Sequence, residues 1–76
     1  MTVPLNSILV GNKCKVKELV SEGLIRRRLL DLGLIQNTIV EVVQTSPFGD
    51  PVAYLIRGTV IALRSELAEM ILVENI

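Results

Sequence analysis

The spacing of hydrophobic and polar residues changes along the first half of the chain. Three lysines alternate with Cys14 and Val16 after residue 12, so polar and apolar side chains fall on opposite sides of the backbone. This period of two predicts a half-buried strand over about 13–20, with Leu19 and Val20 continuing its apolar side. The lysines then form a solvated face that discourages edge-to-edge pairing, and phosphate binding is the less favoured alternative.

A helical period follows this strand. Three apolar residues stand at i, i+4 and i+7, which is typical of a helix that packs one side inward. They are Ile25, Leu29 and Leu32. Ser21 is a favoured N-cap residue and Gly33 suits a left-handed C′ position, so we expect a helix over 22–32. Leu30 falls roughly opposite the apolar stripe and is either exposed or covered by something beyond the helix's own core.

Three consecutive arginines, Arg26, Arg27 and Arg28, lie on this helix. At about 100° per residue their side chains fan around the polar side and do not form one patch. Asp31 can reach Arg27 and Arg28, although with the basic residue first, which is the weaker order. Two interpretations stay open: a solvated face with internal ion pairs, or a contact surface.

The rest of the chain has the pattern of short strands separated by turns. Gly58 divides a tight hairpin whose turn needs a positive φ, and Ser65 caps a short turn of helix. The strands are expected at 38–44, 52–57, 59–64 and about 71–75. The prediction is a single domain over 1–76, mainly β, with one short inserted helix and a C-terminal helical turn, bent into a small barrel. The expected core is Val16, Leu19, Ile25, Leu29, Leu32, Val40, Val42, Leu55, Ile61, Leu63, Ile71 and Val73.

Half of the 76 residues are hydrophobic, but the stretches without a charge are short. The longest, residues 1–12, is broken by Pro4 and Asn6, whereas a membrane-spanning helix needs about 20 apolar residues. No basic residue precedes this stretch and no small-residue cleavage site follows it, which disfavours a secretory signal. We therefore expect a cytoplasmic protein without direct membrane insertion.

The inventory of reactive side chains is small. The chain has no histidine and a single cysteine, Cys14, so it lacks the commonest general base and cannot form an internal disulfide or a thiolate metal cluster. No nucleophile–base pair is recognisable either. We expect no enzyme activity, no cofactor and no metal site, with Cys14 as a small buried apolar residue.

Charge is divided unevenly between the two halves. Residues 1–38 carry six basic and three acidic side chains, and residues 39–76 carry two basic and five acidic ones. A neutral, dipolar domain suits a protein partner better than a nucleic acid, which favours a clearly basic domain.

The hexapeptide SPFGDP, residues 46–51, is rich in turn residues. Pro47 fixes its own φ, Gly49 supplies a conformation that other residues resist, and Asp50 can bond its own downstream backbone. Pro51 then begins the next strand, where a missing N–H does least harm. We expect a turn with Phe48 exposed at its tip.

The ordered combination of short motifs resembles the FeoA family, small proteins of bacterial ferrous iron transport, over about residues 5–74. The motifs are RLLDLGL, GDPV, RG and ALR, followed by a closing ILV. The residues that carry the resemblance are Arg28, Leu29, Leu32, Gly33, Gly49, Asp50, Pro51, Arg57, Gly58, Ala62, Leu63 and Arg64. Where the family commonly has Pro-Gly after LGLI, this chain has Gln36-Asn37, and Asn tolerates a left-handed φ.

The resemblance implies an SH3-like β-barrel and an accessory role beside a membrane Fe(II) permease that carries its own cytosolic G-protein domain. A related domain is fused to iron-dependent repressors, but no helix-turn-helix is recognisable here, so the chain looks like the free-standing form. The leading hypothesis is a protein-interaction module that binds and modulates the permease's G-protein domain. The candidate contact residues are Arg26, Arg27, Leu30, Phe48 and Asp50.

The sequence also allows three other hypotheses. Direct Fe(II) binding, or an iron-responsive regulatory domain, is the main alternative, although Asp50 has no second carboxylate nearby and hard cations want several oxygen ligands together. Nucleic-acid binding is disfavoured because the chain has only Phe48 and Tyr54 as aromatic residues. Self-association around Leu30 or Leu34 is an open possibility.

Overall fold

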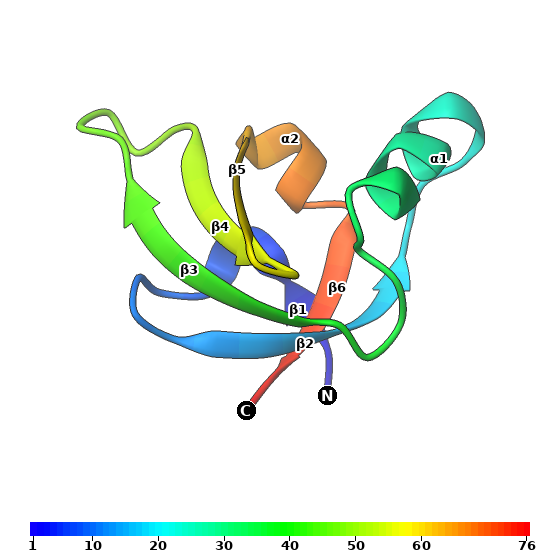
Figure 1. Ribbon diagram of the computed structural model, residues 1–76, viewed down its shortest axis with the longest axis horizontal. Helices are drawn as coiled ribbons and strands as arrows, with labels where there is room; N and C mark the ends of the chain where they lie inside the picture. The colour runs from blue at the N-terminus through cyan, green and yellow to red at the C-terminus, as the bar shows by residue number, and fades with distance from the viewer.

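The computed structural model describes residues 1–76 as one antiparallel sheet of six strands, with two short α-helices and one 3₁₀ turn (Figure 1). The sheet order is β1-β6-β2-β3-β4-β5. The strands are β1 (Val3–Pro4), β2 (Lys13–Leu19), β3 (Ile39–Thr45), β4 (Val52–Ile56), β5 (Thr59–Leu63) and β6 (Ile71–Asn75). The helices are η1 (Leu5–Ser7), α1 (Gly23–Asp31) and α2 (Ser65–Ala68). The prediction of a mainly β domain with one inserted helix and a C-terminal helical turn is confirmed.

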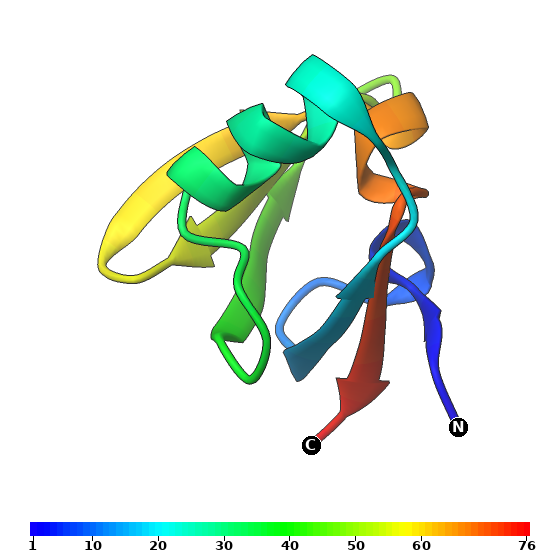
Figure 2. The same cartoon turned by 90° about the vertical axis from the view of Figure 1, so that its right-hand side faces the viewer.

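The sheet bends around the core, and both α-helices lie over its open top (Figures 1 and 2). Strands β3, β4 and β5 form one wall, while β2, β6 and β1 form the other (Figure 2). Strand β1 and the 3₁₀ turn were not predicted, because two residues ending in Pro4 carry no readable period. No helix is long and apolar enough to span a membrane.

Most of the predicted core is buried, and the errors lie where the pattern is uniform. In β4 every residue is apolar, so alternation does not reveal which side faces inward. Tyr54 and Ile56 are the buried pair and Leu55 is half-buried, because Tyr54 pairs with Val42 and Ile56 with Val40 on the inner face. Ile61 and Leu32 are likewise only partly buried. The core residues that the sequence analysis missed are Leu5, Ile8, Leu34, Tyr54, Ile56 and Ala68.

Two further predictions are wrong: that Val20 lies on the apolar side of the first strand, and that Ile25 belongs to the core. Val20 lies just beyond the end of β2 and is exposed, after a register shift between Val16 and Glu18 in the β2–β6 pairing. Ile25 is exposed because α1 is short and only its C-terminal half rests on the barrel. Cys14, in contrast, is fully buried as expected.

The predicted turns are confirmed in their backbone conformations. Asn37 has φ 73°, the left-handed value expected of it after LGLI. Arg57 and Gly58 have φ 51° and 84°, which is the two-residue turn that joins hairpin strands without splaying them. Gly49 has φ 84°, the conformation for which glycine is suited in the SPFGDP turn.

Candidate partner-binding surface

Helix α1 is anchored by its C-terminal end. The Gly33 N–H donates to the Leu30 carbonyl at 3.0 Å, and the Leu34 N–H donates to the Leu29 carbonyl at 3.2 Å. This is the Schellman motif, which needs a positive φ at C′, and Gly33 has φ 98°. Leu29 and Leu34 are both fully buried beneath the motif. The predicted role of Gly33 as the C′ residue is therefore confirmed.

Gly33 also brings two distant motifs together. A Cβ atom at this position would lie 2.7 Å from Cδ of Arg57, so the aliphatic stem of Arg57 crosses directly over the glycine. The Arg57-Gly58 turn of the β4–β5 hairpin therefore packs against the end of α1. These motif residues hold the helix to the sheet.

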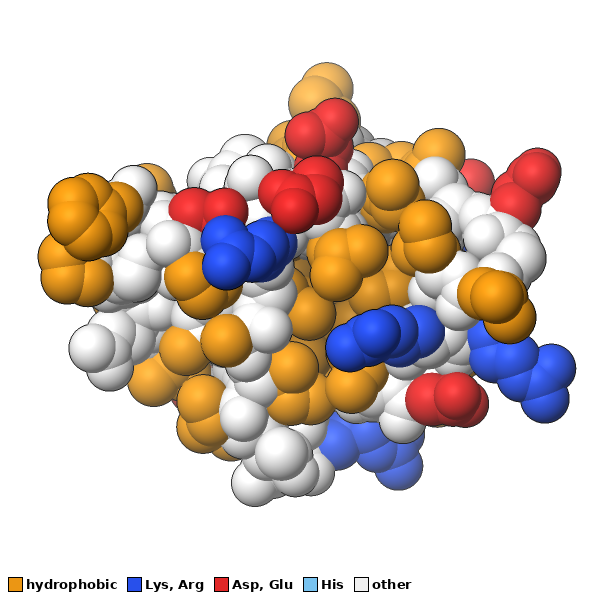
Figure 3. Space-filling view, turned by 90° about the horizontal axis from the view of Figure 1, so that it is seen from above, with side chains coloured by type: hydrophobic (Ala, Val, Ile, Leu, Met, Phe, Trp, Pro, Cys, Tyr) orange, Lys and Arg blue, Asp and Glu red, His pale blue; other side chains and the backbone are white.

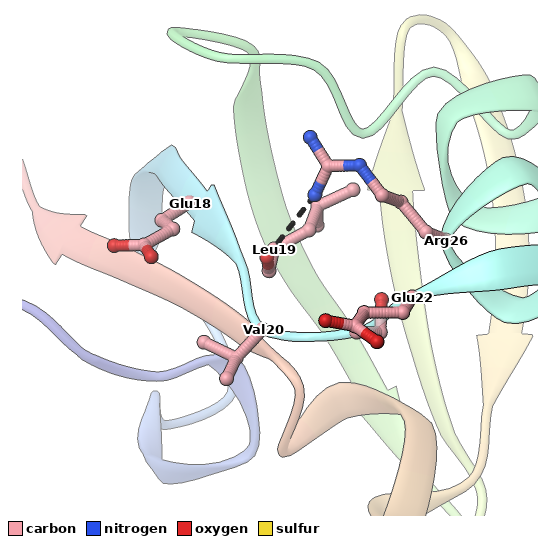
Figure 4. Close-up of a pocket in the computed structure, with 6 residues that line it drawn as sticks. Glu18, Leu19, Val20, Glu22 and Arg26 are labelled. Atoms are coloured by element: carbon pink, nitrogen blue, oxygen red, sulfur yellow. Dashed lines mark hydrogen bonds between the residues drawn. The ribbon is translucent and has the colours of Figure 1, made fainter.

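The N-terminal end of α1 is fastened differently from the prediction. Glu22 is the N-cap and makes no side-chain cap, whereas the Ser21 hydroxyl is buried without a hydrogen-bond partner. The predicted Ser21 cap is therefore wrong. Instead Nη1 of Arg26 donates to the Leu19 carbonyl at 3.2 Å (Figure 4). Both residues line an open hollow of about 690 Å³. Arg26 thus ties the helix to the end of β2.

Several apolar side chains of α1 remain in solvent. The exposed fraction is 86% for Leu24 and 37% for Leu30, which resolves the open question about Leu30 in favour of exposure. Arg26, Arg27 and Leu30 line one hollow of about 360 Å³, and Arg26 and Leu30 also line a second of about 260 Å³ against β2. We call Arg26, Arg27 and Leu30 the α1 surface. Orange and blue side chains lie close together on this side of the molecule, at the right of Figure 3.

The arginines of α1 are not neutralised by the helix itself. The three ion pairs of the structure join the N-terminus or Lys17 to Glu74, and Arg64 to Asp50. The predicted ion pairs of Asp31 with Arg27 and Arg28 are therefore absent, because all three side chains are exposed and the residue order is the weaker one. Arg27 and Arg28 keep their charges free for another molecule.

Asp50 of the SPFGDP loop has a structural role that its local sequence does not predict. Its Oδ1 accepts a hydrogen bond of 2.9 Å from the Ser65 N–H, and its Oδ2 lies 3.8 Å from Arg64. Asp50 therefore caps the first turn of α2 from another part of the chain. The prediction that it bonds its own downstream backbone is wrong, and so is the prediction that Ser65 is the side-chain cap, since Arg64 holds the N-cap position.

Phe48, at the tip of the same loop, is 96% exposed as expected. The loop lies at one end of the molecule's longest axis and α1 at the other (Figure 1), and that axis extends 31 Å. The structure thus brings Arg26, Arg27 and Leu30 together, but it places Phe48 and Asp50 far from them. The five candidate residues do not form one surface.

The remaining motif residues lie in or next to β4 and β5. Leu63 is buried and Ala62 is exposed on β5, while Arg64 is exposed beside Asp50. Pro51 follows a cis peptide bond and directly precedes β4. The order of the motifs along the chain is what marks these residues in the sequence. In the structure each of them lies at a turn, at a helix cap or in the β4–β5 hairpin.

The titratable side chains of the structure do not gather into a metal centre. No group of three or more histidine, cysteine, aspartate or glutamate residues is close enough to hold a metal ion. Cys14 is buried, and burial raises the pKa of its thiol to about 11. The thiol lies 3.6 Å from the Val40 carbonyl, to which it donates, and remains protonated at neutral pH.

Comparisons with known proteins agree with this architecture. The family model described as FeoA domain matches residues 3–75. A fusion of Fe(2+) transport protein A with the Fe(2+) transporter FeoB from Porphyromonas gingivalis is 33% identical over 72 residues, which cover 95% of this chain and 8% of that protein. The chain therefore spans only a small fraction of the relative's length.

Two solved structures share the fold. The FeoA-like protein of Clostridium acetobutylicum is 35% identical, with a TM-score of 0.92, and the alignment covers 99% of this chain and 87% of the other. FeoA of Stenotrophomonas maltophilia, a prokaryotic SH3 domain protein solved with zinc, is 27% identical with a TM-score of 0.83, covering 97% and 89%. The SH3-like fold is thereby confirmed, and the chain belongs to the FeoA family, which is associated with ferrous iron transport.

Proposed function

We propose that this protein is a cytoplasmic accessory of ferrous iron uptake that binds and modulates the cytosolic G-protein domain of the membrane Fe(II) permease. The observation that carries the proposal is the α1 surface, where Leu30 is exposed beside Arg26 and Arg27. An exposed apolar side chain beside arginine suits a protein interface, because the buried core of an interface is more apolar than the rest of the surface and arginine is enriched there.

The position of α1 supports this role. Its C-terminal end is fixed by the buried Leu29 and the Schellman motif, and Arg26 ties its other half to β2. The surface is therefore presented in one conformation before a partner arrives, which lowers the entropic cost of binding. The free charge of Arg27 favours an acidic patch on the partner and raises the association rate at low salt.

The fusion protein from Porphyromonas gingivalis supports the choice of partner. In that relative an FeoA-like segment and the transporter share one chain, so the two parts are held at a high effective concentration. When the small domain is a separate chain, no covalent link keeps it near the transporter. A binding surface would then hold the two proteins together.

The test is a pull-down with the permease's G-protein domain, loaded with GTP analogue or GDP. Leu30→Arg and Arg27→Glu are expected to lose most of the binding, because one places a charge on the apolar centre and the other reverses a contact charge. Val43→Arg and Arg28→Glu are matched controls, since Val43 has a similar exposed fraction of 40% and Arg28 lines neither of the two hollows beside Leu30. Retained binding in both test variants would remove the α1 surface from consideration.

Direct Fe(II) binding is the alternative for which a second measurement is needed. No three potential ligands lie close together in this structure, and hard cations prefer several oxygen ligands in one place. Calorimetric titration with Fe(II) or Mn(II) is expected to show no saturable heat. A saturable heat that disappears in Asp50→Asn or Cys14→Ala would favour the metal-binding alternative.

A further inference from the structure

The two edges of the sheet are protected to different degrees. Strand β1, at one edge, has only two residues and includes Pro4, both of which hinder the addition of another strand. Strand β5, at the other edge, has five residues, TVIAL, with no proline and no charge. A strand of this composition is a template for pairing with an extended segment.

The backbone of β5 has free hydrogen-bonding groups. The two-residue turn makes Ile56 and Thr59 a hydrogen-bonded pair, and such pairs alternate along an antiparallel ladder. The N–H and C=O groups of Val60 and Ala62 therefore point away from β4. No backbone hydrogen bond outside the helices and strands involves residues 59–63, and Val60 is 59% exposed.

A hollow lies beside this edge on the inner side of the sheet. It has a volume of about 360 Å³, and its lining includes Thr59 and Ile61 from β5 together with Leu32 and Arg57. In an added antiparallel strand, the residue opposite Ile61 would point to the same side of the sheet as Ile61. An apolar side chain at that position would enter the hollow.

The charges at the two ends of β5 indicate which kind of strand fits. Arg57 lies at one end and takes part in no ion pair, while Arg64 lies at the other and meets only Asp50, at 3.8 Å. Pairing of β5 with its own copy about Ile61 would bring Arg64 of one copy beside Arg57 of the other at both ends. Like charges in this position oppose self-pairing and favour a strand with acidic ends.

We propose that the free edge of β5 binds an extended protein segment with an apolar residue in its centre and an acidic residue three positions away on each side. The segment pairs antiparallel with β5, its central side chain fills the hollow opposite Ile61, and its acidic residues lie near Arg57 and Arg64. This surface is distinct from the α1 surface, and the inference stands whether or not the α1 surface binds the permease.

The test uses the intact protein and a synthetic peptide, SETTVTTES, with the basic-ended SKTTVTTKS as the matched control. NMR titration of the ¹⁵N-labelled protein is expected to show shifts centred on the Val60 and Ala62 amides and slower hydrogen exchange there. N-methylation of the residues on each side of the peptide's valine is expected to weaken binding at least tenfold. These two residues would face Val60 and Ala62, whereas methylation of the valine itself leaves binding nearly unchanged.

A protein variant gives the complementary result. Val60→Pro removes only an N–H that is free in this structure, and is expected to abolish binding, whereas Val60→Thr keeps the N–H and retains it. Should Val60→Pro fail to fold, the methylated peptides decide alone. The proposal is overturned by no binding at millimolar peptide, by equal binding of the basic-ended peptide, by shifts confined to α1, or by protection of Val60 and Ala62 in a concentration-dependent dimer without peptide.

Discussion

Helix α1 and the SPFGDP loop lie at opposite ends of the molecule and use their conspicuous residues in opposite ways (Figure 1). The loop contains the recognisable Gly49-Asp50-Pro51 motif, and the Asp50 carboxylate caps the first turn of α2 within the domain. Helix α1 has a less distinctive sequence, yet it leaves Leu24, Leu30 and unpaired arginines in solvent. The recognisable motif of the loop thus marks a structural junction, whereas the proposed binding surface on α1 includes side chains, Arg27 and Leu30, that remain exposed.

The buried and the exposed leucines of α1 should differ most in their effect on the free energy of unfolding. Leu29→Ala should lower the free energy of unfolding by about 2–5 kcal/mol, because Leu29 is fully buried and its loss leaves a cavity. Leu24→Ala, the same change on the same helix at an exposed position, should stay within about 0.5 kcal/mol. Urea denaturation measures both values. Equal losses would contradict the division of α1 into a buried anchor and an exposed surface.

The next effect concerns the cap in the loop. Asp50→Ala should lower the free energy of unfolding by about 1–2 kcal/mol, because it removes the acceptor of the Ser65 N–H and the partner of Arg64. Asp31→Ala is the control, since Asp31 is exposed and forms no ion pair. Thermal denaturation compares them, and a loss for Asp50→Ala no larger than for Asp31→Ala would show that the loop is not a structural junction.

The core beneath both regions should make stability depend on alkaline pH. Burial raises the pKa of Cys14 from 9.0 to about 11, and burial together with the charges of Cys14 and Asp50 raises that of Tyr54 from 10.0 to about 12. The unfolded chain loses these protons first, so stability is complete below pH 9 and falls as the pH rises toward 12. At pH 10 the loss should be on the order of 1 kcal/mol. Cys14→Ala should reduce it, and an unchanged slope in that variant would assign the effect elsewhere.

The smallest expected effect is at the tip of the loop. Phe48→Ala should change the free energy of unfolding by less than about 0.5 kcal/mol, because the ring is 96% exposed and buries little area. Chemical denaturation beside Asp50→Ala gives the comparison within one loop. A loss above about 1 kcal/mol would mean that Phe48 packs on the domain in solution.

The fold was largely predictable because alternation and turn residues agree along most of the chain. The Lys13–Leu19 strand, the Gly33 cap and the Arg57-Gly58 turn follow from local rules that the structure obeys. The inner face of β4 was not predictable, since VAYLI is apolar throughout and only pairing with β3 decides that Tyr54 and Ile56 face inward.

The candidate site was predictable only in part, for the same physical reason. Arg26, Arg27 and Leu30 lie within five residues, so helix geometry alone brings them together. The bond between Asp50 and Ser65 joins positions 15 residues apart, and no local rule predicts it. The free edge of β5 depends on the order of strands in the sheet, which the sequence pattern does not state.

The most direct test of the comparison is the affinity of the permease's G-protein domain for Leu30→Ala and Phe48→Ala, measured by biolayer interferometry. We expect Leu30→Ala to weaken binding roughly tenfold or more, equivalent to about 1.4 kcal/mol, and Phe48→Ala to change it less than about twofold. Both side chains are exposed, so neither change should disturb the fold. An unchanged affinity for Leu30→Ala with a large loss for Phe48→Ala would place the binding surface on the loop and not on α1.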